Sequence, residues 1–143
     1  MPLVEFTVAG ALVESSAGVL LVQNRRRNGA MEWSTPGGVI DASDATVLSG
    51  LAREVEEETG LVPQILGLTG RYSRTDGSAV VVFAARVADS AEPGGPRNEI
   101  EEQRWVRHGK ALRLLSRKAR RRLVEALAFA DGVPANGLTQ RVG

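Results

Sequence analysis

The chain has 143 residues, 43% of them hydrophobic and 24% charged, and its formal net charge is +1. This length and composition predict one globular domain and exclude a disordered chain. The near-neutral charge argues against general binding to nucleic acid or to a membrane surface. Since the sequence has no cysteine, it excludes disulfides, thiolate metal sites and a cysteine nucleophile.

The N-terminal residues lack the pattern of a signal peptide, and the longest apolar run, residues 79–85, is too short to span a bilayer. We therefore expect a cytoplasmic protein with no membrane partner. The sequence does not fix the oligomeric state, and a homodimer is one open alternative.

Two strands are predicted first, at residues 4–13 and 18–24, joined by a hairpin connection at 14–18. Residues 25–33 are polar and include a glycine, which predicts a loop. The Pro-Gly-Gly segment at 36–38 cannot continue a regular element, so it indicates a specially shaped backbone.

A helix is predicted for residues 44–59. Asp41 or Ser43 is placed to cap its start, and Gly60 stands where a left-handed C-terminal residue is expected. Apolar residues recur at helical spacing and form one stripe, which predicts the buried face of the helix. The stripe consists of Val47, Leu48, Leu51 and Val55.

Three glutamates, Glu54, Glu57 and Glu58, lie on one side of this helix just before its end. Glutamates at this spacing repel one another, and the C-terminal end of a helix already carries partial negative charge. On the helical wheel they border the apolar stripe, and Arg53, one turn before Glu57, offsets part of their charge. A cluster that breaks local rules in this way indicates a functional site.

The rest of the chain returns to strand patterns and then to a helix. Strands are predicted at residues 64–74, 79–87 and 103–107, a turn at 76–78 and a loop at 89–99. Helical spacing covers residues 110–130, with Leu112, Leu115, Leu123 and Leu127 as core candidates. Residues 131–143 lack an apolar pattern and are predicted to be a flexible tail. The order of elements predicts a single α/β domain over residues 1–130, with a mixed sheet flanked by helices.

The stretch GGVIDASDATVLSGLAREVEEETGL resembles the signature of the Nudix hydrolases. The second half of that signature fits at every position, namely Arg53, Glu54, Val55, Glu57, Glu58, Gly60 and Leu61. Trp33 and the Pro-Gly-Gly segment resemble the family's approach to the motif, and Trp105 resembles its closing strand. The resemblance implies a Nudix-type α/β/α sandwich.

The first half of the signature departs from the family pattern in two ways. Asp44 stands where the family has glutamate, and eight residues separate it from Arg53, one more than usual. We expect the extra residue to be accommodated within residues 45–49. The helix should then keep Glu54 and Glu58 facing the Pro-Gly-Gly segment.

The resemblance implies hydrolysis of a phosphoanhydride in a nucleoside diphosphate linked to another group, with Mg²⁺ or Mn²⁺ as cofactor. Carboxylate oxygens suit such hard cations. Glu57 and Glu58 would hold the ion, with Glu54 a further ligand or the base that activates water. The implied catalytic set is therefore Glu54, Glu57 and Arg53, and the backbone at Gly37 would complete the metal site.

Further residues are candidates for the metal site and for substrate binding. In this family a further carboxylate joins the metal site from the segment before Trp105, and among Glu99, Glu101 and Glu102 we favour Glu102. Gly38 leaves room for a phosphate. The adjacent residues Arg25, Arg26 and Arg27 are candidates to bind substrate phosphates, since a guanidinium group pairs well with phosphate oxygens. The alternative is that they only keep a surface loop solvated.

Two other classes of function stay open besides the enzyme. One is a non-catalytic Nudix-like domain with a nucleotide-binding or regulatory role. The intact second half of the signature argues against this alternative. The other is an RNA-binding or RNA-end-processing protein that uses the basic helix at residues 116–127. The near-neutral charge and the absence of interleaved aromatic residues favour a solvated face for that helix. The expected partner is thus a small nucleotide and not a nucleic acid.

Overall fold

The computed structural model describes residues 7–26, 28–74, 77–88, 92–95 and 100–132. The strands are β1 (Thr7–Ser15), β2 (Gly18–Arg25), β3 (Met31–Ser34), β4 (Gly37–Val39), β5 (Gln64–Ser73), β6 (Ala79–Arg86) and β7 (Ile100–Val106). The helices are α1 (Val47–Thr59), α2 (His108–Leu114) and α3 (Arg117–Gly132). No helix within the described ranges has the length and apolar character needed to cross a membrane.

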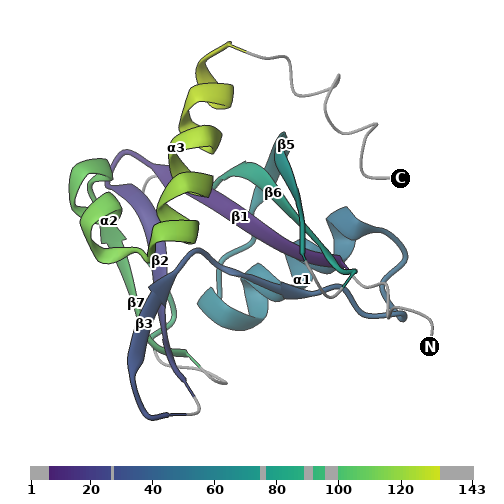
Figure 1. Cartoon of the computed structure of the whole chain (residues 1–143), viewed down its shortest axis with the longest axis horizontal. Helices are drawn as coiled ribbons and strands as arrows, with labels where there is room; N and C mark the ends of the chain where they lie inside the picture. Colours follow the sequence, from purple (N-terminus) through teal and green to yellow (C-terminus); the bar gives the residue numbers. More distant parts are fainter. Residues whose placement is uncertain (1–6, 27, 75–76, 89–91, 96–99, 133–143) are drawn as a thin grey trace.

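The strands form one mixed sheet in the order β3-β2-β1-β6-β5, with β4 paired to β1 and β7 paired to β2. β1 runs parallel to β6 and antiparallel to β2 and β4. β1 and β2 pair only beside their hairpin, so β4 occupies the edge of β1 farther along. Figure 1 shows α1 and α3 flanking this sheet, which confirms the predicted mixed sheet flanked by helices.

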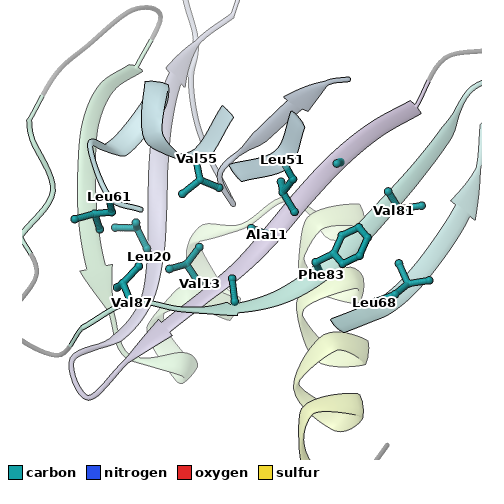
Figure 2. Close-up of a cluster of buried hydrophobic side chains, with 12 residues drawn as sticks. Ala11, Val13, Leu20, Leu51, Val55, Leu61, Leu68, Val81, Phe83 and Val87 are labelled. Atoms are coloured by element: carbon teal, nitrogen blue, oxygen red, sulfur yellow. The ribbon is translucent and has the colours of Figure 1, made fainter. Parts of the chain in front are cut away.

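The core divides into two clusters because successive strand side chains point to opposite faces of the sheet. On one face Ala11 and Val13 of β1 pack with Leu51 and Val55 of α1, and Figure 2 shows this cluster. On the other face the intervening Leu12 belongs to the cluster covered by α2 and α3. Buried β1 therefore anchors both helical layers.

Helix α1 begins at Val47, three residues later than predicted, and its cap is Thr46, so the assignment to Asp41 or Ser43 was wrong. The Thr46 hydroxyl accepts the N–H of Ser49, and the Ser49 hydroxyl accepts the N–H of Thr46. Asp41 instead accepts the N–H of Ser43 within the preceding turn. The predicted left-handed residue is confirmed at Gly60, with a φ of 77°.

Three further expectations were wrong. Residues 31–34 and 37–39 form β3 and β4, where a loop and an interruption of regular structure were predicted, because β2 and β1 supply their hydrogen bonds. The specially shaped backbone predicted for the Pro-Gly-Gly segment is nevertheless present at Gly37, with a φ of 154°. The C-terminal helix is broken into α2 and α3 at Leu115, which takes an extended conformation and bridges to Trp33. Leu48 is 38% exposed, unlike the buried Leu51 and Val55 of its stripe.

Helix α3 runs to Gly132, two residues past the helical spacing predicted for residues 110–130. Residues 133–143, most of the predicted tail, lie outside the described residues. Of the predicted core leucines, Leu115 and Leu123 are buried, while Leu112 and Leu127 are partly buried against the same cluster.

Candidate active site

The acidic side of α1 lies against the two glycines of β4. The N–H of Gly37 donates to Oε1 of Glu58 at 2.7 Å. A Cβ atom on Gly38 would lie 2.7 Å from Oε2 of Glu54, which is closer than any side chain allows without displacing that carboxylate. The expectation that Glu54 and Glu58 face these glycines is therefore confirmed.

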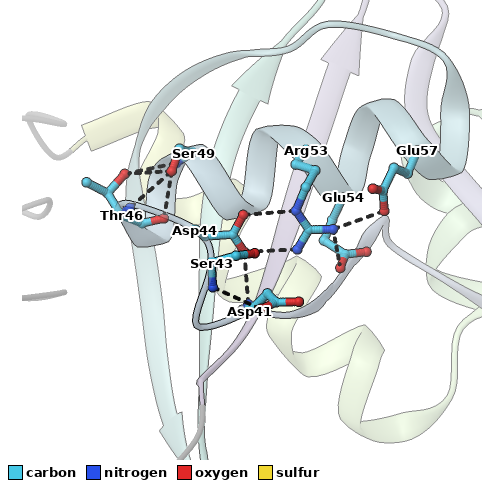
Figure 3. Close-up of polar contacts among 8 residues, drawn as sticks. All are labelled: Asp41, Ser43, Asp44, Thr46, Ser49, Arg53, Glu54 and Glu57. Carbon is cyan, nitrogen blue, oxygen red and sulfur yellow. Dashed lines mark hydrogen bonds and ion pairs between the residues drawn. The ribbon is translucent and has the colours of Figure 1, made fainter.

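Arg53 organises the acids around it, as Figure 3 shows. Its Nε and Nη2 atoms donate to the two carboxylate oxygens of Asp44, each at 2.9 Å. Its Nη1 atom donates to Oε2 of Glu57 at 3.0 Å and lies 3.3 Å from Oε1 of Glu54. One guanidinium thus serves three carboxylates and offsets the repulsion within α1. Asp44, although shorter than glutamate, reaches Arg53 with both oxygens.

These contacts and burial move the pKa values of the site in different directions. Hydrogen bonds from Arg53 hold the pKa of Asp44 below its usual value. Burial raises the pKa of Glu54, and the charge of Arg53 only partly opposes that rise. The hydrogen bonds to Asp44 also raise the pKa of Arg53, which therefore stays cationic. Glu54 is thus the carboxylate beside Gly38 with a raised proton affinity, a property suited to a general base.

The donor atoms of this site fit a hard divalent cation, since they are carboxylate and backbone oxygens. In the described part of the chain, however, no three acidic or histidine side chains already converge on one point. Glu57, 49% exposed, points to Arg53. For all three glutamates of α1 to hold one ion, Glu57 would exchange Arg53 for it.

Strand β7 places its glutamates with other partners. Oε1 of Glu102, the favoured additional ligand, lies 2.7 Å from Nη2 of Arg104. Glu101 pairs with Arg25 at 3.3 Å. Glu99 lies outside the described residues.

Gln103 is the β7 side chain that reaches α1, and the sequence interpretation missed it. Its Nε2 donates to the backbone carbonyl of Glu58 at 2.7 Å. Its Oε1 is buried and has no hydrogen-bond partner among the described residues. Gln103 and Trp105 are two residues apart in β7, so their side chains point to the same face of the sheet, and Trp105 packs on the α1 side. This spacing was the signal in the sequence that could have identified Gln103.

The arginines proposed for phosphate binding are exposed and paired in the structure. Arg25 contacts Glu101, and Arg26 lies 3.2 Å from Glu32. Arg27 lies outside the described residues.

Both tryptophans pack against the core. Trp33 packs against the α3-side cluster and carries the guanidinium of Arg104 at 5.2 Å from its ring centroid. Trp105 packs against the α1-side cluster.

Comparison with known proteins identifies relatives of this chain. A MutT-like protein of Streptomyces ambofaciens is 40% identical over 92 residues, which are 64% of this chain and 57% of that protein. An ADP-ribose pyrophosphatase of Methanocaldococcus jannaschii is 32% identical over 65 residues, or 46% of this chain and 38% of that protein. The chain thus spans less than two thirds of the length of either relative.

A solved structure confirms the fold. The crystal structure of a NUDIX hydrolase from Nitrosomonas europaea superposes with a TM-score of 0.76 at 23% identity, covering 91% of this chain and 74% of that one. The sequence model of the NUDIX domain matches residues 5–127, which include the acidic end of α1, the glycines of β4 and most of α3. The chain therefore belongs to the NUDIX domain family.

Proposed function

We propose that this protein is a divalent-metal-dependent hydrolase that cuts a phosphoanhydride bond in a nucleoside diphosphate linked to another group. The observation that carries the proposal is the position of the Glu54 and Glu58 carboxylates directly against the backbone of Gly37 and Gly38, a set of oxygen atoms that suits a divalent cation. The names of the MutT-like and ADP-ribose pyrophosphatase relatives support this substrate class. The cytoplasmic location and the homodimer stay predictions.

The proposed site uses Glu57, Glu58 and the backbone carbonyl of Gly37 to hold Mg²⁺ or Mn²⁺, and Glu54 is either a further ligand or the base. When bound, the ion would neutralise phosphate charge, lower the pKa of a water molecule and align it with phosphorus. Glu102 would have to exchange Arg104 for the ion, so we place it second to the α1 glutamates.

Of these two roles we propose the base for Glu54, because its carboxylate lies against Gly38 beside the proposed metal ligands, held by Arg53 at 3.3 Å. It accepts a proton from the attacking water while the water oxygen bonds to phosphorus and the anhydride P–O bond breaks. Arg53 positions Glu54 and Glu57. A role of Gly38 in phosphate binding stays a prediction, because the Glu54 carboxylate occupies the space beside it. For a role in substrate binding, Arg25 and Arg26 would exchange their glutamate partners for phosphate oxygens; Arg27 stays a prediction.

The two alternative functions receive less support. A non-catalytic domain does not require the close packing of Glu54 on Gly38 or the shared contacts of Arg53. An RNA-binding role would use the cations of α3, but Arg121 already pairs with Glu125.

A nucleotide screen with product analysis tests the proposed function. We expect a free nucleoside triphosphate, or a small nucleoside diphosphate derivative, to be hydrolysed only when Mg²⁺ or Mn²⁺ is present. The products should be a nucleoside monophosphate with pyrophosphate or with the partner group's phosphate. Turnover confined to capped or long RNA, with free nucleotides untouched at high enzyme concentration, would contradict the proposal.

Millimolar Mg²⁺ or Mn²⁺ is also expected to raise the melting temperature, because an ion bound only by the folded state stabilises it. An ion at about five times its Kd contributes about 1 kcal/mol, which corresponds to about 2–4 °C for a domain of this size. Differential scanning fluorimetry checks this against monovalent salt of equal ionic strength. The double variant Glu57→Gln and Glu58→Gln should lose the rise; an equal rise in that variant would rule out the proposed ligands.

A further inference from the structure

A cavity of about 180 Å³ lies between the sheet and α3, on the face opposite α1. Gly37 and Gly38 form part of its wall. The Glu54 carboxylate lies on the other side of the same glycines, 2.7 Å from where a Gly38 Cβ would stand. Because glycine has no side chain, only the backbone of β4 separates the cavity from this carboxylate. The cavity therefore adjoins the proposed phosphate site.

The floor of the cavity is apolar and is built from the sheet and from one side of α3. Its side chains belong to the α3-side core cluster and include Leu12, Val80, Val82, Leu123 and Ala126. Branched side chains standing side by side on a sheet form a broad apolar surface, which suits the face of a planar ring. A phosphate or a sugar would gain little from this surface.

Arg122 is the charged residue among the described residues that line the cavity. Its guanidinium carbon lies 5.3 Å from the centroid of the Tyr72 ring. The Tyr72 hydroxyl donates to Glu125, which also accepts from Nε of Arg121 at 2.9 Å, so the ring beneath Arg122 is fixed. Within the described ranges no carboxylate lies at ion-pair distance from Arg122, in contrast to Arg121. Its N–H donors are therefore available to a ligand.

Ser34 and Thr35 also line the cavity wall. No acidic side chain is among the described lining residues, so the wall offers donors to a ligand edge that accepts. Arginine pairs in this way with O6 and N7 of guanine, whereas adenine presents an amino group at position 6.

We propose that the cavity takes the base of the nucleotide substrate and that Arg122 selects a base with a carbonyl oxygen on that edge, guanine over adenine. This specificity role rests on the proposed function, because the glycines of β4 link the cavity to the phosphate site. Tyr72 acts through Arg122, as a positioning residue that holds the guanidinium plane.

The test measures binding, so that it does not depend on turnover. In a Glu57→Gln background with Mg²⁺ present, calorimetry gives the Kd values of GMP, AMP and ribose 5-phosphate. We expect GMP to bind about tenfold more tightly than AMP. Arg122→Met should remove this difference and leave the affinity for ribose 5-phosphate unchanged. Arg122→Lys keeps the charge but loses the planar fork, so it should also lose the difference.

Lys118→Gln is the matched control, since it removes a positive charge from an exposed position on the same helix and should change no Kd. Equal affinity for GMP and AMP overturns the proposal. An equal loss of affinity for GMP, AMP and ribose 5-phosphate in Arg122→Met also overturns it, because Arg122 would then contact the phosphate. GTP hydrolysis without any GMP preference refutes the base-selecting role alone. A GMP preference removed by Arg122→Met, in a protein that hydrolyses no nucleotide, supports the base site and refutes the proposed function.

Discussion

Glu57→Gln and Glu58→Gln should each lower turnover of the best nucleotide substrate by at least about a hundredfold, the scale on which charged catalytic groups act. Glutamine keeps the size of the side chain but removes the charge that a divalent ion needs. Folding should be nearly unaffected. The Glu57 pair with Arg53 is exposed and contributes about 0.5 kcal/mol, while the repulsion relieved within α1 has a similar size.

The Glu58 variant retains a further contact that keeps β4 in place. The amide oxygen of a glutamine at this position can still accept the N–H of Gly37, which now donates to Oε1 of Glu58. Glu56→Gln is the matched control, because Glu56 is exposed on the same helical turn and faces away from β4. Steady-state kinetics with saturating Mg²⁺ and urea unfolding separate activity from stability. Near-normal turnover in both variants would show that the glutamates do not form the catalytic site.

The acidic helix could be predicted because its signals are local. Apolar residues at helical spacing place one face of α1 on the core, and Leu51 and Val55 are fully buried there. The left-handed Gly60 marks its end. These features fix the rotation of α1, and with it the direction in which Glu54 and Glu58 point. Short apolar runs rich in strand-forming residues likewise marked the buried strands β1 and β6.

Short strands that form only because they hydrogen-bond to a neighbouring strand could not be predicted from the sequence. β4 has only three residues, and its position depends on hydrogen bonds such as the Ile40 N–H to the Thr7 carbonyl. No local pattern in a Pro-Gly-Gly segment indicates such a partner. The cap of α1 was equally underdetermined, since Asp41, Ser43 and Thr46 are all good capping residues.

The contacts around the site depend on residues that are distant in sequence. The Glu58 carbonyl meets the side chain of Gln103, 45 positions away, and Tyr72 meets Glu125, 53 positions away. Residue type alone does not specify such pairs, because several glutamines, glutamates and arginines compete for each contact. The sequence therefore predicted the acidic set of α1 and the pairing of Arg53 with Glu57, but not the contact of Arg53 with both oxygens of Asp44, the partner of Glu102 or the cavity beside Arg122.

Gly37→Ala is expected to destabilise the fold, whereas Gly38→Ala should damage the site and leave the fold intact. A Cβ on Gly37 would lie 2.1 Å from the carbonyl oxygen of Ala9, in a backbone conformation with φ of 154° that disfavours other residues. Since strand backbone cannot move aside, we expect a loss of about 3 kcal/mol or more. A Cβ on Gly38 meets only the end of the flexible Glu54 side chain.

For Gly38→Ala we therefore expect a stability loss of about 1 kcal/mol or less and at least a tenfold loss of turnover, roughly the effect of misplacing a catalytic group by 1 Å. Gly29→Ala separates backbone strain from overlap, because its φ is 85° and no atom lies within 4 Å of the added Cβ. It should cost about 1–2 kcal/mol. Urea unfolding and kinetics on all three variants check this ranking. Full turnover in Gly38→Ala would show that catalysis does not require the position of Glu54 against β4, and this would contradict the role of Glu54 as the base.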